Sequence, residues 1–316
     1  MPYAKGQGLH QINAPLTNLS VQYANNLTGF INNKFPTIQV QKESDAYYIY
    51  GREHFKIPQT IRANGSPANS AEYTVSTSTY TLEEHALRDV VTDRDRGNAD
   101  AALQPDIDAM ENLVSRIMLR KEIQARNLLF TTTNFTNSHS LTSTLGWQDL
   151  TTISDPIGDI QTATSIILTN TGKRPNTLVV GYNAFNKGLR NHPNIIERIK
   201  YSERAIISED IVAAVFGIQN IWVGEAVQNT AAEGAAADSM AYIWATDAWV
   251  GYLEPNAKLK SASAVYNFTK GGNGAYPYAV KKYRDEEVSG DWVEVSSFFD
   301  TRAVATLSGY LIKGVD

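Results

Sequence analysis

The 316-residue chain contains no cysteine. Disulfide bonds, thiolate metal sites and cysteine nucleophiles are therefore excluded from its chemistry. Long apolar runs are missing too, because no stretch approaches the roughly 18 residues that a membrane-spanning helix needs. The first residues lack the charged lead and the apolar core of a signal peptide. From these absences we expect a soluble protein that is made in a cytoplasm and has no membrane partner.

An excess of positive charge is also lacking. The chain has 33 acidic and 28 basic side chains, so its formal net charge is −5. A protein dedicated to nucleic-acid binding would show the opposite balance. The hydrophobic fraction of 42% is ordinary for a globular protein, and the length is enough for two domains or one large elaborated domain.

Motifs for catalysis or metal binding are missing as well. No HExxH motif is present and the histidines share no metal-type spacing, so we interpret them as surface or capping residues. They are His10, His54, His85, His139 and His192. The best metal candidate is the acidic stretch with Asp93, Asp95, Asn98 and Asp100, which does not fit the register of a calcium loop. We interpret it as a solvated linker, and we expect no catalytic residue, metal or cofactor.

The longest helical pattern runs from Pro105 to Phe130, with no glycine and no proline after its first position. Its apolar residues recur at helical spacing, and Asp106, Asp108 and Glu111 in its first two turns precede its basic residues, as the helix dipole favours. At about 1.5 Å per residue this helix would be about 39 Å long. We predict a spine helix on which the rest of the chain packs. Its basic side chains form a strip expected to pair within the helix or between subunits, namely Arg116, Arg120, Lys121 and Arg126.

The chain before this helix predicts an arm and a hairpin. Residues 1–45 are polar and asparagine-rich, which indicates an extended arm with one short helix at Leu16–Phe30 and no core of its own. Strands at Tyr47–Tyr50 and Glu72–His85 flank the turn residues Asn64-Gly65. An isolated two-stranded ribbon is marginally stable, so we expect the hairpin to lean on something outside its own subunit. A polar connector follows at Leu87–Asp100.

The chain after the spine helix begins with a loop at Thr131–Thr144 and then changes pattern. Helices expected at 155–172, 183–189 and 208–217 alternate with short apolar strands at 177–181 and 221–224. We expect Gly172 and Gly217 to end the first and the third helix, and the first to bury one face that carries Ile157, Ile160, Ile167 and Leu168. This alternation predicts a compact α/β or α+β lobe, and the C-terminal third reads as strands that return to the lobe and to the spine helix. We interpret Trp244, Trp249 and Trp292 as packing residues within strands.

The order of these parts resembles the major capsid proteins of tailed bacteriophages, which have the Hong Kong 97-like fold. The resemblance is carried by YYIYGREHFKIPQTIRANGSPANSAEYTVSTSTYTLEEHALRDVV, by NADAALQPDIDAMENLVSRIMLRKEIQARNLLF, by residues 155–224 and by GDWVEVSSFFDTRAVATLSGYLI. It implies an α+β fold with four parts: an N-terminal arm (1–45), a hairpin called the E-loop (46–92), a peripheral domain (93–145 and 265–300, with the spine helix at 105–130) and an axial domain (146–264 and 301–316).

The resemblance also implies a function. Subunits would tile as hexamers and pentamers into an icosahedral head that encloses double-stranded DNA without sequence-specific binding. The protein would be a non-enzymatic part of the virion, assembled in the cytoplasm of the host bacterium. Besides other copies of itself, its expected partners are a portal, a decoration protein where the shell carries one, and a separate scaffolding protein, because no long helical leader precedes the arm.

Contacts between subunits are expected at two places. In the hairpin they involve Lys56, Arg62 and Asn64, with Arg62 pairing with an acid of the adjacent subunit, and on the spine helix they involve Arg116 and Arg120. Some members of the family crosslink a hairpin lysine to a neighbouring asparagine. Lys56 is the only lysine in the hairpin, and we expect an uncrosslinked shell.

Three other functions compete with the viral shell. A cellular encapsulating compartment of the same fold would dock cargo through an N-terminal helix, which the broken arm fits poorly. A soluble α+β enzyme would need a deep pocket with clustered titratable groups. An adhesive or carbohydrate-binding module would use exposed tryptophans, whereas the tryptophans here lie in apolar strands.

Overall fold

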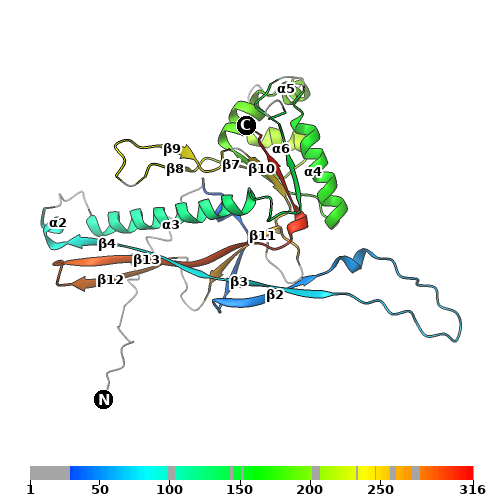
Figure 1. Cartoon of the computed structure of the whole chain (residues 1–316), viewed down its shortest axis with the longest axis horizontal. Coiled ribbons are helices and arrows are strands. Elements are labelled where there is room, and N and C mark those ends of the chain that lie inside the picture. Colours follow the sequence, from blue (N-terminus) through cyan, green and yellow to red (C-terminus); the bar gives the residue numbers. More distant parts are fainter. Residues whose placement is uncertain are drawn as a thin grey trace, which may run out of the picture.

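The computed structural model describes residues 29–98, 104–142, 145–150, 153–200, 207–232, 234–245, 247–256, 261–271 and 278–315. Figure 1 shows an elongated sheet with the long helix α3 (Pro105–Leu129) lying along it and a compact lobe at the C-terminal end of α3. A strand ribbon extends away from both. No helix within these described ranges is both long and apolar enough to cross a membrane.

The elongated sheet is centred on β13 (Gly290–Ala303). The first part of β13 lies between β12 (Ala279–Asp285) and β4 (Glu83–Thr92), and its last residues pair with β11 (Val265–Lys270). The short strand β1 (Thr37–Val40) adds to β11 in parallel. The apolar stripe of α3 packs on this sheet, as predicted for a spine helix. The residues that form this core include Met110, Val114, Ile117, Val280, Val293 and Val295.

The prediction of a polar connector at Leu87–Asp100 is wrong. Residues 83–92 are the strand β4, and Asp93–Asn98 form the short helix α2. The many charged residues of β4 did not indicate a strand. They are compatible with one because only one face of β4 packs against α3, so every second side chain can remain in solvent. Val91 is the buried anchor on the face toward α3.

The lobe is a five-stranded sheet that is covered on both faces. Its strand order is β5-β14-β10-β6-β7, formed by Asn137–Ser140, Gly309–Lys313, Asp247–Gly251, Thr177–Gly181 and Asn220–Gly224. Leu178 and Val180 point into the core under the helices, whereas Val179 between them packs with Leu129 at the end of α3. Both faces of β6 and β10 are therefore apolar, as expected for strands without an exposed face.

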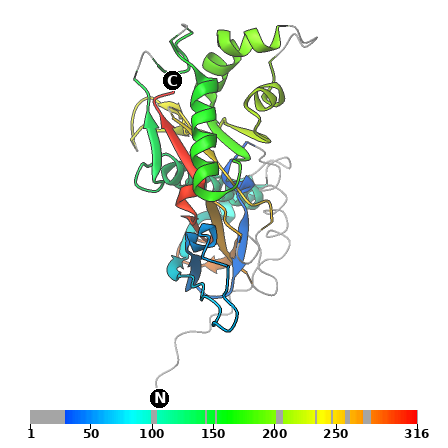
Figure 2. The same cartoon turned by 90° about the vertical axis from the view of Figure 1, so that its right-hand side faces the viewer.

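Helices α4 (Pro156–Thr171), α5 (Pro193–Ile199) and α6 (Glu209–Phe216) cover one face of this sheet, with α4 standing in front of β14 in Figure 2. Gly172 ends α4 and Gly217 ends α6 in the left-handed conformation, as both glycines predicted. The predicted helix at 183–189 is instead a π-helical turn (η3, Ala184–Gly188) followed by a 3₁₀ turn (η4, Leu189–Asn191).

Two smaller predictions about this region are wrong. The loop expected at Thr131–Thr144 contains β5, a polar edge strand that is held by backbone pairing with β14 and so leaves no apolar signature. Leu168, expected on the buried face of α4, is 41% exposed, because Ile167 occupies that face.

The hairpin consists of β2 (Ser44–Tyr50) and β3 (Val75–Thr81), paired antiparallel from Ser44↔Thr81 to Tyr50↔Val75. Residues 51–74 at its tip contain only the 3₁₀ turn η2 (Arg52–Phe55). Besides the support expected from outside the subunit, the hairpin contacts the end of α4 in its own subunit. Arg52 Nη1 lies 3.5 Å from Asn170 Oδ1 at the end of α4, and a Cβ added to Gly172 would meet the Phe55 ring at 3.2 Å.

The arm is partly built into the body. The helix predicted at Leu16–Phe30 lies almost wholly outside the described residues, but Ile31 and Phe35 are buried beside the end of α3. Between them lies the 3₁₀ turn η1 (Asn32–Lys34). The arm was expected to have no core of its own, and Ile31 and Phe35 instead join the core at the end of α3.

The strands predicted for the C-terminal third are confirmed as β9 (Met240–Tyr242), β10, β11, β12, β13 and β14. The strand β9 pairs with β8 (Val227–Asn229) in a small hairpin beside the lobe. A 3₁₀ turn, η5 (Thr306–Ser308), precedes β14.

Candidate functional site

The hairpin tip carries apolar side chains that its own subunit leaves exposed. Ile57 is 94% exposed and Ile61 is 78% exposed, and Tyr48, Phe55 and Tyr73 are also largely exposed. Exposed apolar groups gathered on one segment indicate a surface that is covered by another molecule. Two ring contacts in this part of the hairpin are long, with the ring centroid of Tyr73 6.3 Å from that of Tyr50 and 6.1 Å from that of His54.

The three hairpin residues expected at subunit contacts all lie in this exposed tip. Lys56, Arg62 and Asn64 are solvent-exposed, and Asn64 precedes Gly65, whose φ of +81° identifies the tight turn that the Asn-Gly pair predicted. Residues 56–71 contain two basic and no acidic side chains. The tip therefore presents positive charge together with apolar groups.

The two arginines expected at contacts on α3 lie on its exposed side, and Figure 1 shows α3 well separated from the tip of the β2–β3 hairpin. Arg116 Nε donates a hydrogen bond to Asn112 Oδ1 at 3.2 Å, one turn earlier on the helix. The structure thus places the five expected contact residues in two separate regions rather than in one site.

Lys121 does not belong to the predicted basic strip. Its side chain is 9% exposed, with Nζ at 4.5 Å from the centre of the Phe299 ring and 5.5 Å from that of Tyr278. Burial lowers the pKa of Lys121 to about 8. The sequence held the signal that we missed, because Lys121 follows Ile117 by four residues and so shares its buried face.

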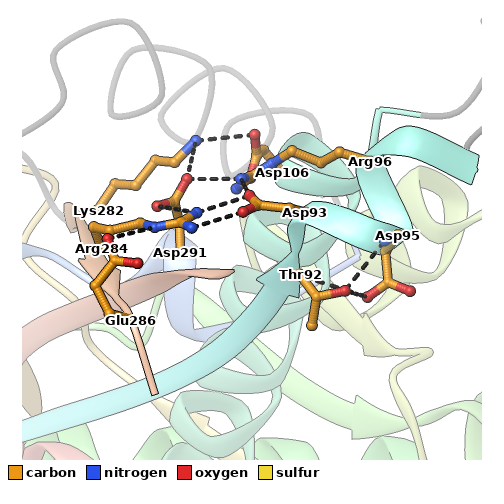
Figure 3. Close-up of polar contacts among 9 residues, drawn as sticks. All are labelled: Thr92, Asp93, Asp95, Arg96, Asp106, Lys282, Arg284, Glu286 and Asp291. Atoms are coloured by element: carbon orange, nitrogen blue, oxygen red, sulfur yellow. Dashed lines mark hydrogen bonds and ion pairs between the residues drawn. The ribbon is translucent and has the colours of Figure 1, made fainter. Parts of the chain in front are cut away.

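The acidic stretch proposed as a solvated linker takes part in an ion-pair network, which we call the terminal charge cluster (Figure 3). The cluster consists of Asp93, Arg96, Asp106, Lys282, Arg284, Glu286 and Asp291. It joins α2, the start of α3 and the β12–β13 turn at one end of the elongated sheet. Among the described residues, no group of three or more His, Asp or Glu side chains is placed to hold a metal ion.

Arg96 and Asp106 form the centre of this cluster. Arg96 contacts Asp106 and Asp291 at 2.7 Å each, and Lys282 Nζ lies 3.0 Å from Asp106. Burial raises the pKa of Asp106, but hydrogen bonds from Arg96 and Lys282 outweigh it, so this pKa lies below its ordinary value. Asp106, which we had interpreted through the helix dipole, therefore fastens the start of α3 to β12.

The described histidines lie both at the surface and in packed positions, and His54 and His139 are exposed, as predicted. His192 is buried and its Nδ1 accepts the Asn194 N–H at 3.3 Å, which confirms a capping histidine, while His85 stacks on Phe299 at 4.3 Å and is no surface residue. Trp244 and Trp249 are fully buried, as predicted. Trp292 is half-buried beneath the Arg88 guanidinium.

Comparisons with known proteins show which proteins this chain resembles. No family model matches the chain. The chain is 27% identical over 315 residues to the major capsid protein of Burkholderia phage BcepMu, covering 98% of both chains. It is also 27% identical over 229 residues to the major capsid protein of Pseudomonas phage JBD67, covering 71% of each.

Solved structures show the same fold. A phage-related protein from Bordetella bronchiseptica RB50 matches with a TM-score of 0.73 at 23% identity, covering 97% of this chain and 98% of that one. The capsid of cyanophage P-SCSP1u matches with a TM-score of 0.60 at 12% identity, over 90% of this chain and 88% of that one. The SrpI encapsulin of Synechococcus elongatus matches with a TM-score of 0.51 at 11% identity, over 92% and 89%.

These comparisons agree with the expectation from the order of parts. Over nearly its whole length the chain is similar in sequence to a phage major capsid protein, and it has the fold of solved capsid proteins, the Hong Kong 97-like fold.

Proposed function

We propose that copies of this chain assemble as hexamers and pentamers into an icosahedral head that encloses double-stranded DNA without sequence-specific binding. The observation that carries the proposal is the hairpin tip, whose exposed apolar side chains need a cover that the subunit does not supply. The net charge of −5 suits a shell that confines DNA without gripping it.

We assign the parts of the subunit as the resemblance implies. Residues 1–45 are the N-terminal arm, 46–92 the E-loop, 93–145 and 265–300 the peripheral domain with its spine helix at 105–130, and 146–264 with 301–316 the axial domain. The separate apolar cores under α3 and under α4 support a division into two bodies. The continuous pairing of β4 with β13 argues for counting the second half of the E-loop segment with the peripheral sheet.

At the subunit contacts, the positive hairpin tip with Lys56, Arg62 and Asn64 meets an acidic surface of the adjacent subunit, and Arg62 forms an ion pair there. Arg116 and Arg120 contact a second neighbour from the exposed side of α3. The shell is not crosslinked. It is built in the host bacterial cytoplasm with a separate scaffolding protein and a portal, and a decoration protein where one is present.

The experiment is electron microscopy of the purified protein together with sizing by light scattering. Closed icosahedral particles of uniform size are the expected result, and deletion of residues 62–69 is expected to leave a folded monomer that forms no particles. Arg62→Glu should impair assembly, whereas Arg94→Glu, an exposed arginine in α2, should not. Intact particles from the deletion variant would show that the hairpin does not hold the shell together.

The second candidate is an encapsulating compartment, which the fold match to an encapsulin favours. The two functions differ in content. Particles from infected or induced cells that contain double-stranded DNA support the phage head, and particles that contain a protein cargo support the compartment.

A further inference from the structure

Glu122 is a fully buried carboxylate on α3, with 0% of its surface exposed. It accepts hydrogen bonds from three donors. The backbone N–H groups of Ile31 and Asn32 donate to Oε1 at 2.8 Å and to Oε2 at 2.9 Å. The Trp244 indole N–H donates to Oε1 at 2.6 Å. The donors lie 90, 91 and 122 residues from Glu122 in sequence, so one side chain connects three separate segments of the chain.

The two backbone donors lie where the N-terminal segment enters the body. Ile31 and Asn32 open the 3₁₀ turn η1, and Ile31 and Phe35 fill the core beside Leu129 and Phe130. Downstream, Asn267 ties the segment to β11, since its side-chain amide donates to the Asn32 carbonyl at 2.9 Å. The bonds to Glu122 thus hold the N-terminal segment directly after Phe30, which packs against the core under α3.

The third donor belongs to the lobe. Trp244 meets the ring of Phe130 edge-on, with ring centroids 5.3 Å apart. Its position leaves no room for a side chain at residue 224 of β7, where a Cβ would lie 2.3 Å from the Trp244 ring. Because the Trp244 ring is tightly packed, its hydrogen bond to Oε1 also fixes the position of the Glu122 carboxylate.

Burying the Glu122 carboxylate away from water is unfavourable for the folded subunit. Burial raises the pKa of Glu122, and three hydrogen bonds and the more distant Lys34 only partly oppose this. An apolar side chain would avoid that cost, but it would leave the N–H groups of Ile31 and Asn32 without these bonds in the core. Buried charged groups of this kind serve to fix one arrangement more than to add stability.

Resting on the proposed assembly function, we propose that Glu122 is the positioning residue that fixes where the N-terminal segment joins the subunit, and that uniform shells require this fixed joint. A subunit without the carboxylate keeps its lobe and its elongated sheet. It loses the defined path of residues 31–40, so its arms leave the body in varied positions.

The test uses Glu122→Gln, which keeps the shape and replaces one acceptor oxygen by a donor. Asp108→Asn, at an exposed position of the same helix, is the matched control for the lost charge. In unassembled subunits, amide hydrogen exchange of residues 31–40 should become faster by about 10- to 100-fold, with exchange in α3 and β10 unchanged. In assembly reactions, Glu122→Gln should give few closed particles or particles of mixed size, and Asp108→Asn should behave as the unaltered protein.

Three results would overturn the proposal. One is unchanged exchange of residues 31–40 in Glu122→Gln, and another is faster exchange throughout the subunit. The third is local loosening with normal, uniform particles. Asn32→Ala removes the Asn32 side chain but keeps the backbone N–H that donates to Glu122, so it should accelerate exchange of residues 31–40 less than Glu122→Gln does. Equal acceleration in the two variants would assign the joint to the Asn32 side chain instead. If the unaltered protein never forms particles, the proposed function fails, whereas the exchange result still decides whether Glu122 holds the joint.

Discussion

Replacing Lys121 by methionine should stabilise the unassembled subunit. Methionine has a similar length and can fill the same space between α3 and β13 without carrying a charge. Because burial alone lowers the pKa of Lys121 from 10.5 to about 8, the folded state holds this charge less favourably than water does.

The magnitude follows from that pKa. Each tenfold change in proton affinity corresponds to about 1.36 kcal/mol, so the buried ammonium costs ~3 kcal/mol at pH 7. Cation–π contacts of Nζ with the rings of Phe299 and Tyr278 stabilise the charged side chain by about 1 kcal/mol. Lys121→Met should therefore raise the free energy of unfolding by ~2 kcal/mol.

The assay is urea unfolding of unassembled subunits, followed by circular dichroism at several pH values. The folded subunit releases the Lys121 proton near pH 8, whereas the unfolded chain keeps it until about pH 10.5. Between these values the unfolded state binds more protons, so the unaltered protein gains stability as the pH rises and the advantage of methionine shrinks. Comparing the two proteins at each pH cancels the titration of tyrosines.

Arg120→Met is the control, since Arg120 is the adjacent cation and lies on the exposed side of α3. It should change the free energy of unfolding by less than about 0.5 kcal/mol. A loss of stability of about 1 kcal/mol or more in Lys121→Met at pH 7 would refute the reasoning, and so would a difference that does not change between pH 8 and 10.5.

Three further outcomes are expected in unfolding experiments. Gly224→Ala should lower the free energy of unfolding by about 2 to 4 kcal/mol, because its Cβ would overlap the fully buried Trp244 ring, and a variant as stable as the parent would contradict the close approach. Asp106→Asn should lower it by about 1 to 2 kcal/mol in low salt and by less at about 1 M salt, and an effect that salt leaves unchanged would argue against ion pairing. Burial lowers the pKa of His192 below 6.5, so its contribution to stability is complete above that pH and falls as the pH drops through the folded value. His192→Asn should accordingly weaken the loss of stability between about pH 6.5 and pH 5, and an unchanged pH profile would assign the loss to other groups.

The sequence was most informative where local chemistry decides the structure. The helix α3 could be predicted because Pro105 begins it and no later glycine or proline interrupts it. Gly172 marked the end of α4 because a left-handed residue is needed there.

Structure that depends on remote partners could not be predicted. The strands β4 and β5 are polar, and each becomes a strand only through pairing with a segment that lies 173 (β5) or 198 to 216 (β4) residues later in the chain. The same holds for the terminal charge cluster, in which Asp106 contacts Lys282. Glu122 was overlooked although its spacing after Met118 places it on the buried face, because a carboxylate there is against the usual rule.

The passage from β3 into β4 has a mechanical consequence. Residues 75–92 are extended apart from Leu82, which is buried in a small cluster with Tyr80 and Phe268 and whose N–H donates to the Glu43 carbonyl at 2.7 Å. The hairpin and the elongated sheet are therefore joined by two consecutive strands, with Leu82 anchored where β3 passes into β4. A force applied to the hairpin tip would be carried along these strands to β13, which bears Asp291 of the terminal charge cluster near its start.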